Sequence, residues 1–419
     1  MLLQFSVENF QSIKNKVILS LEPSQDKEHP ENIITKKKYS AMNTIVIYGA
    51  NASGKSTLFK ALTIALNTIR TSSNVQITNA IPVNPFRFDE VSIKHPTSFE
   101  FIFVANNGKK YVYGFSAFSD RIVEEYLYVY NTAKPSLIFD RTNTVEYKFP
   151  RQLKTEMELV LQRNTPNKLF LSTATSWNVS ATKPAFEWLA TGMDTFTNII
   201  DMQGMALDMY RNEQHGEFTA FTQELMQHAD INISSIKVKA REITQDQLNQ
   251  NPFGIIFQMP VVQKHYEYQI TTGHIIKKDD GSKKEYPLQL ADESLGTQQL
   301  FTFGPILKNA FDFGKVIMID EIDKSLHPFI VQFLMNLFRN PEINKKGAQL
   351  IATTHETALL SLDTFRRDQI FFTEKNSDTG ITDLYSLDEF SVRKTDNIEK
   401  GYLLGRYGAI PYPYTEDII

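Results

Sequence analysis

The spacing of apolar residues near the start of the chain predicts two strands, then a third strand joined by a loop to a helix. Apolar and polar residues alternate along 2–7 and 17–21, as they do in strands of a half-buried sheet. The β-branched run Thr44–Tyr48 has the pattern of a fully buried strand and ends at Gly49. From 53 to 70 the apolar residues recur at helical spacing, so the chain continues as a glycine-containing loop and a helix.

The middle of the chain mixes strand and helix patterns. Three alternating stretches between 85 and 130 predict strands, and a hairpin turn is expected at Asn106, Asn107 and Gly108. The patterns that follow are helical at 153–162 and 186–229, strand-like at 231–239 and turn-like at 279–282.

After about residue 287 helices and strands alternate again, which is typical of an α/β core. The expected order is a helix at 298–311, a strand at 315–319, a helix at 327–338 and strands at 349–353 and 369–372. We therefore expect one α/β domain in two parts, 1–130 and 287–419, separated by a compact α+β insertion at 131–286. The insertion has no sustained heptad pattern, so a long coiled coil is not expected.

The loop after the first buried strand has a complete Walker A sequence, GANASGKS, at 49–56. Its backbone N–H groups and the following helix N-terminus form a cradle for phosphates. We expect Lys55 to reach the β- and γ-phosphates of ATP, and the hydroxyl of Ser56 to bind Mg²⁺. The other expected nucleotide contacts in this segment are Gly49, Asn51, Ser53, Gly54 and Thr57.

A Walker B segment is expected at 316–321, where four apolar residues precede Asp320 and Glu321. On its own this pattern is more often a plain strand end, but together with Walker A it indicates phosphoryl transfer. Asp320 is expected to hold Mg²⁺, and Glu321 to orient the attacking water. A pair of carboxylates, rather than one aspartate, favours ATP hydrolysis over binding alone.

A third motif, ESLGTQQ at 293–299, opens a helix about 20 residues before Walker B. Here the chain resembles the ABC ATPases, specifically the SMC-like, RecF-like and OLD-like heads. The resemblance implies an ABC-type P-loop head with a mixed sheet, in which Ser294 and Gly296 bind the γ-phosphate held by a second copy. Two copies would then form a head-to-tail homodimer or a higher homo-oligomer. The alternative is a helix cap without a ligand.

Two further segments match this resemblance. Ser325 lies at the position of the D-loop, which crosses the dimer interface, and His355 lies at the position of the switch histidine, which contacts the γ-phosphate. Together with Glu321 and Lys55, His355 is expected to be catalytic.

Two positions of the ABC pattern are not matched. The arginine that often follows an Asn-Phe pair is replaced by Gln11 and Ser12, and whether Lys14 compensates is open. The residue at the Q-loop position is also undecided. Gln76 is one candidate, and the other is the segment 82–88, which contains no glutamine.

Segments along almost the whole chain resemble the AAA-type ATPases of bacterial anti-phage and abortive-infection systems, the RloA/AbiL-like group. They include LLQFSVENFQSIK, PTSFE, ESLGTQQL, DEIDKSLHP, RRDQIFFTEK and YLLGRYGAIP. The resemblance implies a sensor or scaffold in defence that controls a separate effector, a nuclease or toxin encoded nearby. A DNA repair or recombination ATPase like RecF is the alternative, and a transporter subunit is a weaker one.

Composition limits the partners. The net charge is −4, from 44 Lys and Arg against 48 Asp and Glu, so any contact with nucleic acid would need a local basic patch. There is no cysteine, which excludes disulfides, thiolate metal sites and cysteine nucleophiles. Neither a secretion signal nor a membrane-spanning run is found, so we expect a cytoplasmic protein without a membrane partner.

Two groups of charged residues are expected to have no role in the chemistry. Glu124, Glu125 and the scattered histidines of the insertion are expected on a solvated face. Five basic residues near the C-terminus are candidates for nucleic-acid contact, although surface ion pairs are favoured: Arg366, Arg367, Arg393, Lys394 and Arg406.

Overall fold

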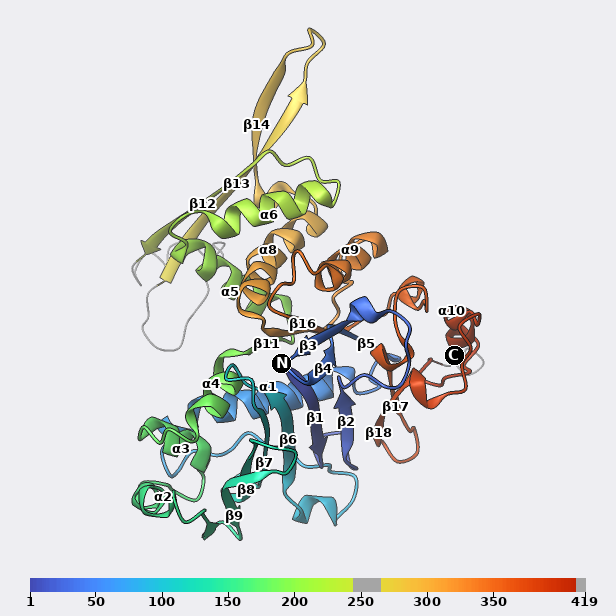
Figure 1. The fold of residues 1–419 in the computed structure, drawn as a ribbon. Helices are drawn as coiled ribbons and strands as arrows, with labels where there is room; N and C mark the ends of the chain where they lie inside the picture. Colours follow the sequence, from blue (N-terminus) through green and yellow to red (C-terminus); the bar gives the residue numbers. More distant parts are fainter. Residues whose placement is uncertain (244–264, 412–419) are drawn as a thin grey trace, which may run out of the picture. The chain divides into compact units, whose positions relative to one another are not determined.

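The computed structural model describes residues 1–243 and 265–411, which form two compact units (Figure 1). Unit 1 contains Met1–Thr197, Phe313–Ile322 and Leu334–Ile419, and unit 2 contains Asn198–Asp312 and Asp323–Phe333. These limits differ from the insertion expected at 131–286. Residues 131–197 belong to unit 1 because their strands and helices pack on its sheets, whereas 287–312 belong to unit 2.

Unit 1 is built on a mixed six-stranded sheet with the order β11-β15-β16-β5-β17-β18. Neighbouring strands are parallel except β17 and β18. The strands are β5 Thr44–Tyr48, β11 Met193–Phe196, β15 Val316–Ile319, β16 Gln349–Thr353, β17 Ile370–Lys375 and β18 Thr382–Ser386. Every residue of β5, β15 and β16 is buried, which explains their nearly continuous apolar sequences.

A second sheet of unit 1 is antiparallel, with the order β10-β9-β8-β7-β6-β1-β2. Its strands are β1 Leu2–Glu8, β2 Val17–Ser20, β6 Thr97–Val104, β7 Lys110–Ala117, β8 Ile122–Tyr130, β9 Ser136–Thr142 and β10 Glu146–Lys148. The predicted hairpin turn joins β6 to β7, with Gly108 at a φ of 73°. The alternating patterns therefore predicted β1, β2, β6, β7 and β8 correctly, whereas β9 and β10 were not predicted.

Helix α1, Lys55–Thr71, contacts β1 of the antiparallel sheet and β11 of the mixed sheet. Its buried residues include Leu58, Leu62, Leu66 and Ile69, at the helical spacing that predicted it. The other β-strands and α-helices that lie wholly in unit 1 are β3 Ile33–Lys36, β4 Tyr39–Met42, α2 Lys154–Leu161, α3 Phe170–Ser176, α4 Lys183–Thr191 and α10 Ile398–Leu403.

The helical pattern expected across 186–229 is interrupted by β11, whose residue Met193 pairs with Val316 of β15. This part of the expectation was wrong. Four residues are too few for an alternating pattern to emerge, and what makes β11 a strand is its parallel pairing with a distant segment.

Unit 2 combines helices with the three-stranded antiparallel sheet β12-β13-β14. Its elements are α5 Ile199–Asn212, α6 Glu217–His228, β12 Ser235–Ile243, β13 His265–Lys277, β14 Lys283–Gln289, α8 Leu295–Phe313 and the first residues of α9 Pro328–Arg339. Tyr210 of α5 stacks on Phe301 of α8 at 4.5 Å and donates a hydrogen bond of 2.8 Å to its carbonyl. These contacts fix α5 on α8.

The helices of the described residues are short. With 19 residues, α8 is the longest of them, and no long coiled coil is formed in this part of the chain. None of the helices within 1–243 and 265–411 combines the length and apolar character needed to cross a membrane.

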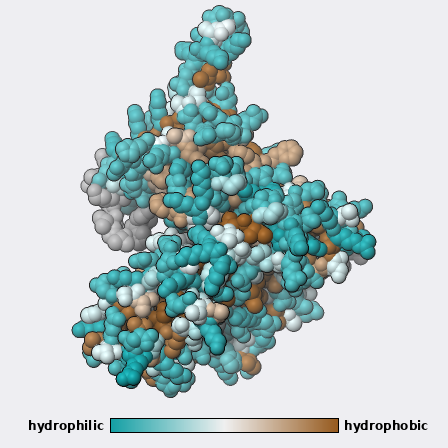
Figure 2. Space-filling view, viewed as in Figure 1, coloured by the Kyte–Doolittle hydropathy of each residue, from teal (hydrophilic) through white to brown (hydrophobic). Residues whose placement is uncertain are grey.

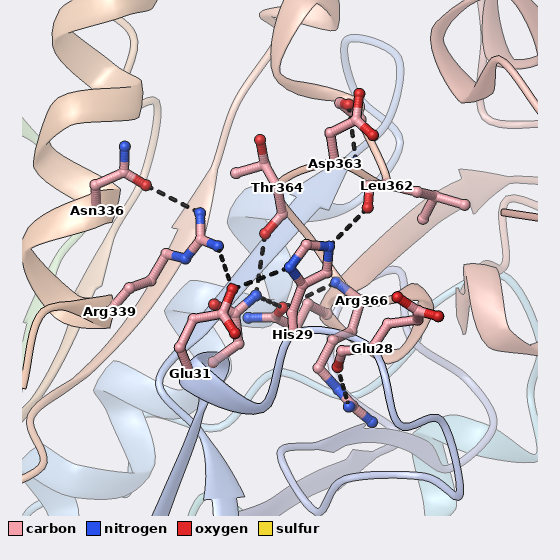
Figure 3. A network of polar contacts seen from close by, with 12 residues as sticks. Glu28, His29, Glu31, Asn336, Arg339, Leu362, Asp363, Thr364 and Arg366 are labelled. Atoms are coloured by element: carbon pink, nitrogen blue, oxygen red, sulfur yellow. Dashed lines mark hydrogen bonds and ion pairs between the residues drawn. The ribbon is translucent and has the colours of Figure 1, made fainter. Parts of the chain in front are cut away.

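The loop before β3 is tied to C-terminal segments of unit 1 by polar contacts (Figure 3). Glu31 accepts a hydrogen bond of 2.8 Å from Arg339 and lies 3.0 Å from Nδ1 of His29, whose Nε2 contacts the carbonyl of Leu362 at 2.7 Å. Burial opposes the charge of Glu31, but hydrogen bonds from its own backbone, His29 and Arg339 outweigh it and lower its pKa to about 2. The loop is thus held by residues more than 300 positions away.

Two of the basic residues near the C-terminus are committed to internal ion pairs. Arg366 is 1% exposed, donates two hydrogen bonds to Asp368 and a third to the carbonyl of Glu28. Arg367 pairs with Asp26 at 2.8 Å. Arg366 is therefore not a contact for nucleic acid, and its ion pair is buried rather than superficial.

The expectation that Glu125 lies on a solvated face was wrong. Its side chain is fully buried and accepts hydrogen bonds from the backbone N–H groups of Phe170 and Leu171 and from the hydroxyl of Tyr113. Burial raises the pKa of Glu125, and Arg141, 3.7 Å away, counteracts this. Alternation explains the error, because Glu124 and Glu125 are neighbours in β8 and must face opposite sides of the sheet.

We expect Glu125→Ala to destabilise unit 1 by about 3–5 kcal/mol, because it leaves the buried Arg141 without its carboxylate. Urea unfolding monitored by tryptophan fluorescence would measure this, since both tryptophans, Trp177 and Trp188, lie in unit 1. The matched control is Glu124→Ala at the exposed neighbouring position, which should change stability by less than about 0.5 kcal/mol. Equal losses in both variants would contradict the buried network.

Candidate nucleotide site

The loop between β5 and α1 is shaped by two close approaches to the strands beside it. Gly54 has a φ of 112°, and a Cβ there would lie 2.4 Å from Cγ2 of Thr382. At Gly49 a Cβ would lie 2.4 Å from Oγ1 of Thr373. Larger side chains are therefore excluded at both positions, and helix α1 begins only after Gly54, at Lys55.

Lys55 is 6% exposed and points back into this loop. Its ammonium donates hydrogen bonds to the carbonyls of Gly49 at 2.6 Å and Ala50 at 3.1 Å. A positive charge is thus held beside backbone N–H groups at a helix N-terminus, which is an arrangement that favours phosphate.

Ser56 and Asp320 meet at the end of β15. The hydroxyl of Ser56 donates to Oδ2 of Asp320 at 2.7 Å, and the hydroxyl of Thr353 donates to Oδ1 at 2.6 Å. Thr353 in turn accepts the backbone N–H of Glu321 at 2.7 Å. Carboxylate and hydroxyl oxygens are the donors that Mg²⁺ prefers, so this corner of the site fits the cation.

No cluster of three or more His, Asp or Glu side chains placed to hold a metal occurs in the residues that the structure describes. One carboxylate and one hydroxyl suit Mg²⁺, which commonly takes its other ligands from water and from the phosphates of a nucleotide.

Glu321 and His355 follow the ends of neighbouring parallel strands, β15 and β16. Both side chains are exposed and line the same cavity as the Walker A loop. Glu321 has a φ of 54°, a left-handed conformation that costs a non-glycine residue roughly 1–3 kcal/mol and is often found at functional sites. The conformation turns the chain directly after Asp320.

The cavity has a volume of about 630 Å³, within the range of roughly 300–1,000 Å³ of small-molecule sites. Of the residues predicted from the sequence, it is lined by Asn51, Ser53, Gly54, Lys55, Ser56, Thr57, Glu321 and His355. Gly49 and Asp320 contact lining residues without lining it themselves. One cavity in unit 1 thus collects residues from three separate segments of the chain.

The sequence did not single out several lining residues: Arg87, Phe88 and Lys375. Arg87 and Phe88 lie in the segment 82–88, a Q-loop candidate from the sequence, whereas no local motif marks Lys375, which ends β17 at the edge where β5 leads into the phosphate loop. Gln11 and Ser12 also line the cavity, whereas Lys14 pairs with Asp89 at 2.8 Å and does not.

Of the two Q-loop candidates, the segment 82–88 reaches the cavity, through Asn84, Pro85, Arg87 and Phe88. Gln76 is absent from its lining.

The expected signature residues lie in unit 2, at the start of α8. The hydroxyl of Ser294 accepts the backbone N–H of Thr297 at 3.2 Å and lies 2.9 Å from its hydroxyl, so Ser294 caps the helix. A Cβ at Gly296 would lie 3.0 Å from the carbonyl of Ser325, whose φ is 63°. The signature and D-loop segments are therefore adjacent within unit 2, and Ser294 and Ser325 are exposed.

The site and the fold together define a P-loop ATPase of the ABC type, with an α/β fold. A phosphate loop lies between β5 and α1, two carboxylates follow the end of β15, and unit 1 combines a mixed sheet with an antiparallel one. The chain belongs to the family described as "AAA domain, putative AbiEii toxin, Type IV TA system", whose model matches residues 45–361. This match confirms the AAA-type ATPase family that the sequence motifs led us to expect.

Individual relatives are more distant. The Retron Vc95 probable ATPase of Vibrio cholerae serotype O1 biovar El Tor is 23% identical over 381 aligned residues, which cover 79% of this chain and 69% of that protein. Among solved structures, an Smc head bound to the C-winged helix domain of ScpA is 13% identical with a TM-score of 0.47, covering 92% of this chain and 97% of that one. RecF with ATP is 12% identical with a TM-score of 0.36, covering 92% and 97%.

Proposed function

We propose that this ATPase hydrolyses ATP between two head-to-tail copies of the chain, and that it acts as a sensor or scaffold controlling a separate effector in anti-phage defence. The proposal of ATP hydrolysis rests on one observation: Lys55, Ser56, Glu321 and His355 all line the same cavity. Phosphoryl transfer needs positioning and charge stabilisation more than covalent chemistry, and these side chains supply both.

The residues of the cavity have distinct roles in this proposal. When ATP binds, the ammonium of Lys55 would donate to the β- and γ-phosphates in place of the carbonyls of its own loop. Ser56 and Asp320 would hold Mg²⁺. Bound Mg²⁺ supplies charge neutralisation on the phosphates. Glu321 orients and polarises the attacking water, and His355 contacts the γ-phosphate from the neighbouring strand.

The dimeric arrangement is supported by unit 2. Ser294 is exposed at the N-terminus of a 19-residue helix, next to the backbone carbonyl of Ser325. An exposed hydroxyl at a helix N-terminus is suited to an anion. We propose that the anion is the γ-phosphate in the cavity of a second copy.

Ser294→Arg tests this arrangement. The long cationic side chain should leave ATP binding by the separate copies unchanged, because Ser294 lies outside the cavity of unit 1, but it should block dimerisation. Light scattering after gel filtration, with and without ATP and Mg²⁺, would show a dimer for the parent and a monomer for the variant. Equal loss of ATP binding in Ser294→Arg would argue that the signature acts within its own chain.

The biological part rests on the family. Its description names a toxin of a type IV toxin–antitoxin system, and the Vibrio relative is a retron ATPase. We propose that ATP holds two copies together and that hydrolysis or a phage-derived signal releases or activates the effector.

Purification of the tagged protein from its host with its neighbouring genes intact would test the effector. A stoichiometric nuclease or other toxic protein is expected to co-purify. Recovery of DNA and repair factors without an effector would instead support a repair ATPase. Full protection against phage by this chain expressed alone would contradict the need for an effector.

A further inference from the structure

Glu293, the residue before the signature serine, has an almost buried carboxylate. Its side chain is 9% exposed, and its Oε1 accepts hydrogen bonds from two side chains of β13. One donor is the hydroxyl of Thr272, which is fully buried, and the other is Nε2 of His274 at 2.7 Å. Thr272 and His274 are two positions apart in a strand, so both project from the same face of the sheet.

The main chain of Glu293 is fixed as firmly as its carboxylate. Its carbonyl accepts Nε2 of Gln298 at 2.9 Å, and its N–H donates to the carbonyl of Leu290 at 3.1 Å. Ser294 follows directly and caps α8 through Thr297. The position of the signature serine is thus set from one side by its own helix and from the other by β13.

The same strand forms one arm of a long hairpin. β13 has 13 residues and pairs along its length with β12 and then with β14. The base is held together by Ser234 and Ser235, which donate hydrogen bonds of 2.6 and 2.8 Å to Glu285 of β14. Displacement of such a paired strand moves all its residues together, including Thr272 and His274.

The outer part of this hairpin extends away from the helices of unit 2 (Figure 1). All seven residues of β14 are exposed. In the space-filling view the hairpin is mostly hydrophilic with one hydrophobic patch (Figure 2). Four lysines flank its turn: Lys277, Lys278, Lys283 and Lys284.

We propose that Thr272 and His274 are positioning residues for the signature, and that through Glu293 they couple the β13–β14 hairpin to the presentation of Ser294. The inference rests on the proposed ATP-bound dimer, in which Ser294 serves the second copy. Neither residue lines the cavity of unit 1. Loss of either contact should therefore leave ATP binding by one copy intact and weaken only the dimer.

The test uses full-length protein carrying Glu321→Gln, so that ATP is bound but turned over slowly. In this background His274→Ala should raise the concentration needed for ATP-dependent dimerisation by roughly tenfold or more, the range expected for a lost hydrogen bond to a charged group. The dissociation constant for a fluorescent ATP analogue should stay within about twofold. In otherwise unmodified protein, kcat should fall at low protein concentration and recover as the concentration is raised.

Two further variants separate positioning from general stabilisation. His274→Gln retains an N–H donor and should restore most of the dimerisation, whereas Thr272→Val removes only the second donor and should weaken it. His228→Ala is the matched control. His228 is an exposed histidine of the same unit, and its Nδ1 contacts the carbonyl of Glu224 in its own helix. It should behave as the parent.

Dimerisation of His274→Ala equal to that of the parent, with ATP binding intact, would overturn the positioning role. So would an equal loss in His274→Gln, because a donor would then be irrelevant. A parent that binds ATP without dimerising would overturn the dimer itself and the inference with it. The two failures are distinguished by whether the parent or only the variant is affected.

Discussion

Glu321→Gln should slow ATP hydrolysis by roughly 10²- to 10⁴-fold, the contribution typical of a positioned general base. ATP binding should persist, because Glu321 lines the cavity but is not part of the phosphate loop that holds the nucleotide. The amide also keeps the size of the carboxylate. The unhydrolysed nucleotide should then hold the two copies together. Phosphate release under saturating ATP would measure the rate, and light scattering would measure the dimer.

Glu342→Gln is the matched control for this variant, since Glu342 is exposed in unit 1 and does not line the cavity. It should hydrolyse ATP at the parent rate. Normal turnover by Glu321→Gln would mean that another group orients the water, and the role assigned to Glu321 would be wrong.

Lys55→Ala should weaken ATP binding by roughly 100-fold or more, since it removes charge-assisted hydrogen bonds worth about 1.5–3 kcal/mol each. This buried ammonium lies within the phosphate loop, where it donates hydrogen bonds to the carbonyls of Gly49 and Ala50. Calorimetric titration with ATP and Mg²⁺ would measure the loss, and hydrolysis should disappear with it.

Lys60→Ala offers a control on the same helix, because Lys60 is exposed and lies outside the cavity. It should bind ATP like the parent. If both lysine variants lost binding equally, the effect would come from general charge rather than from the phosphate loop.

The parts of the site that local sequence could predict are those built by one continuous segment. Thr44–Tyr48 was predicted with its observed bounds, because a buried parallel strand is apolar along its whole length. The phosphate loop follows it directly, and its conformation depends on Gly49 and Gly54, which the motif contains. The start of α1 was expected two residues early, because Gly54 takes a φ of 112° and delays the helix to Lys55.

The parts that could not be predicted depend on distant segments. Lys375 reaches the cavity only because the sheet places the end of β17 there, and no local pattern marks it. The segment 82–88 was a Q-loop candidate, but nothing in its sequence singled out Arg87 and Phe88. Glu125 looked like a surface carboxylate until the fold placed Arg141 and the N–H groups of Phe170 and Leu171 around it. The contact of His274 with Glu293 likewise joins residues 19 positions apart.

The order of strands in the mixed sheet has a consequence for synthesis on the ribosome. β5 lies between β16 and β17, and Leu350 of β16 pairs with Thr44 of β5. At translation rates of about 5–20 residues per second, the emerging β5 must wait roughly 15–60 s before either neighbour exists. During that time an entirely apolar-facing strand has no partner in its sheet. Unpaired apolar strands make such incomplete chains prone to aggregation, and here that exposure lasts until the C-terminal third is made.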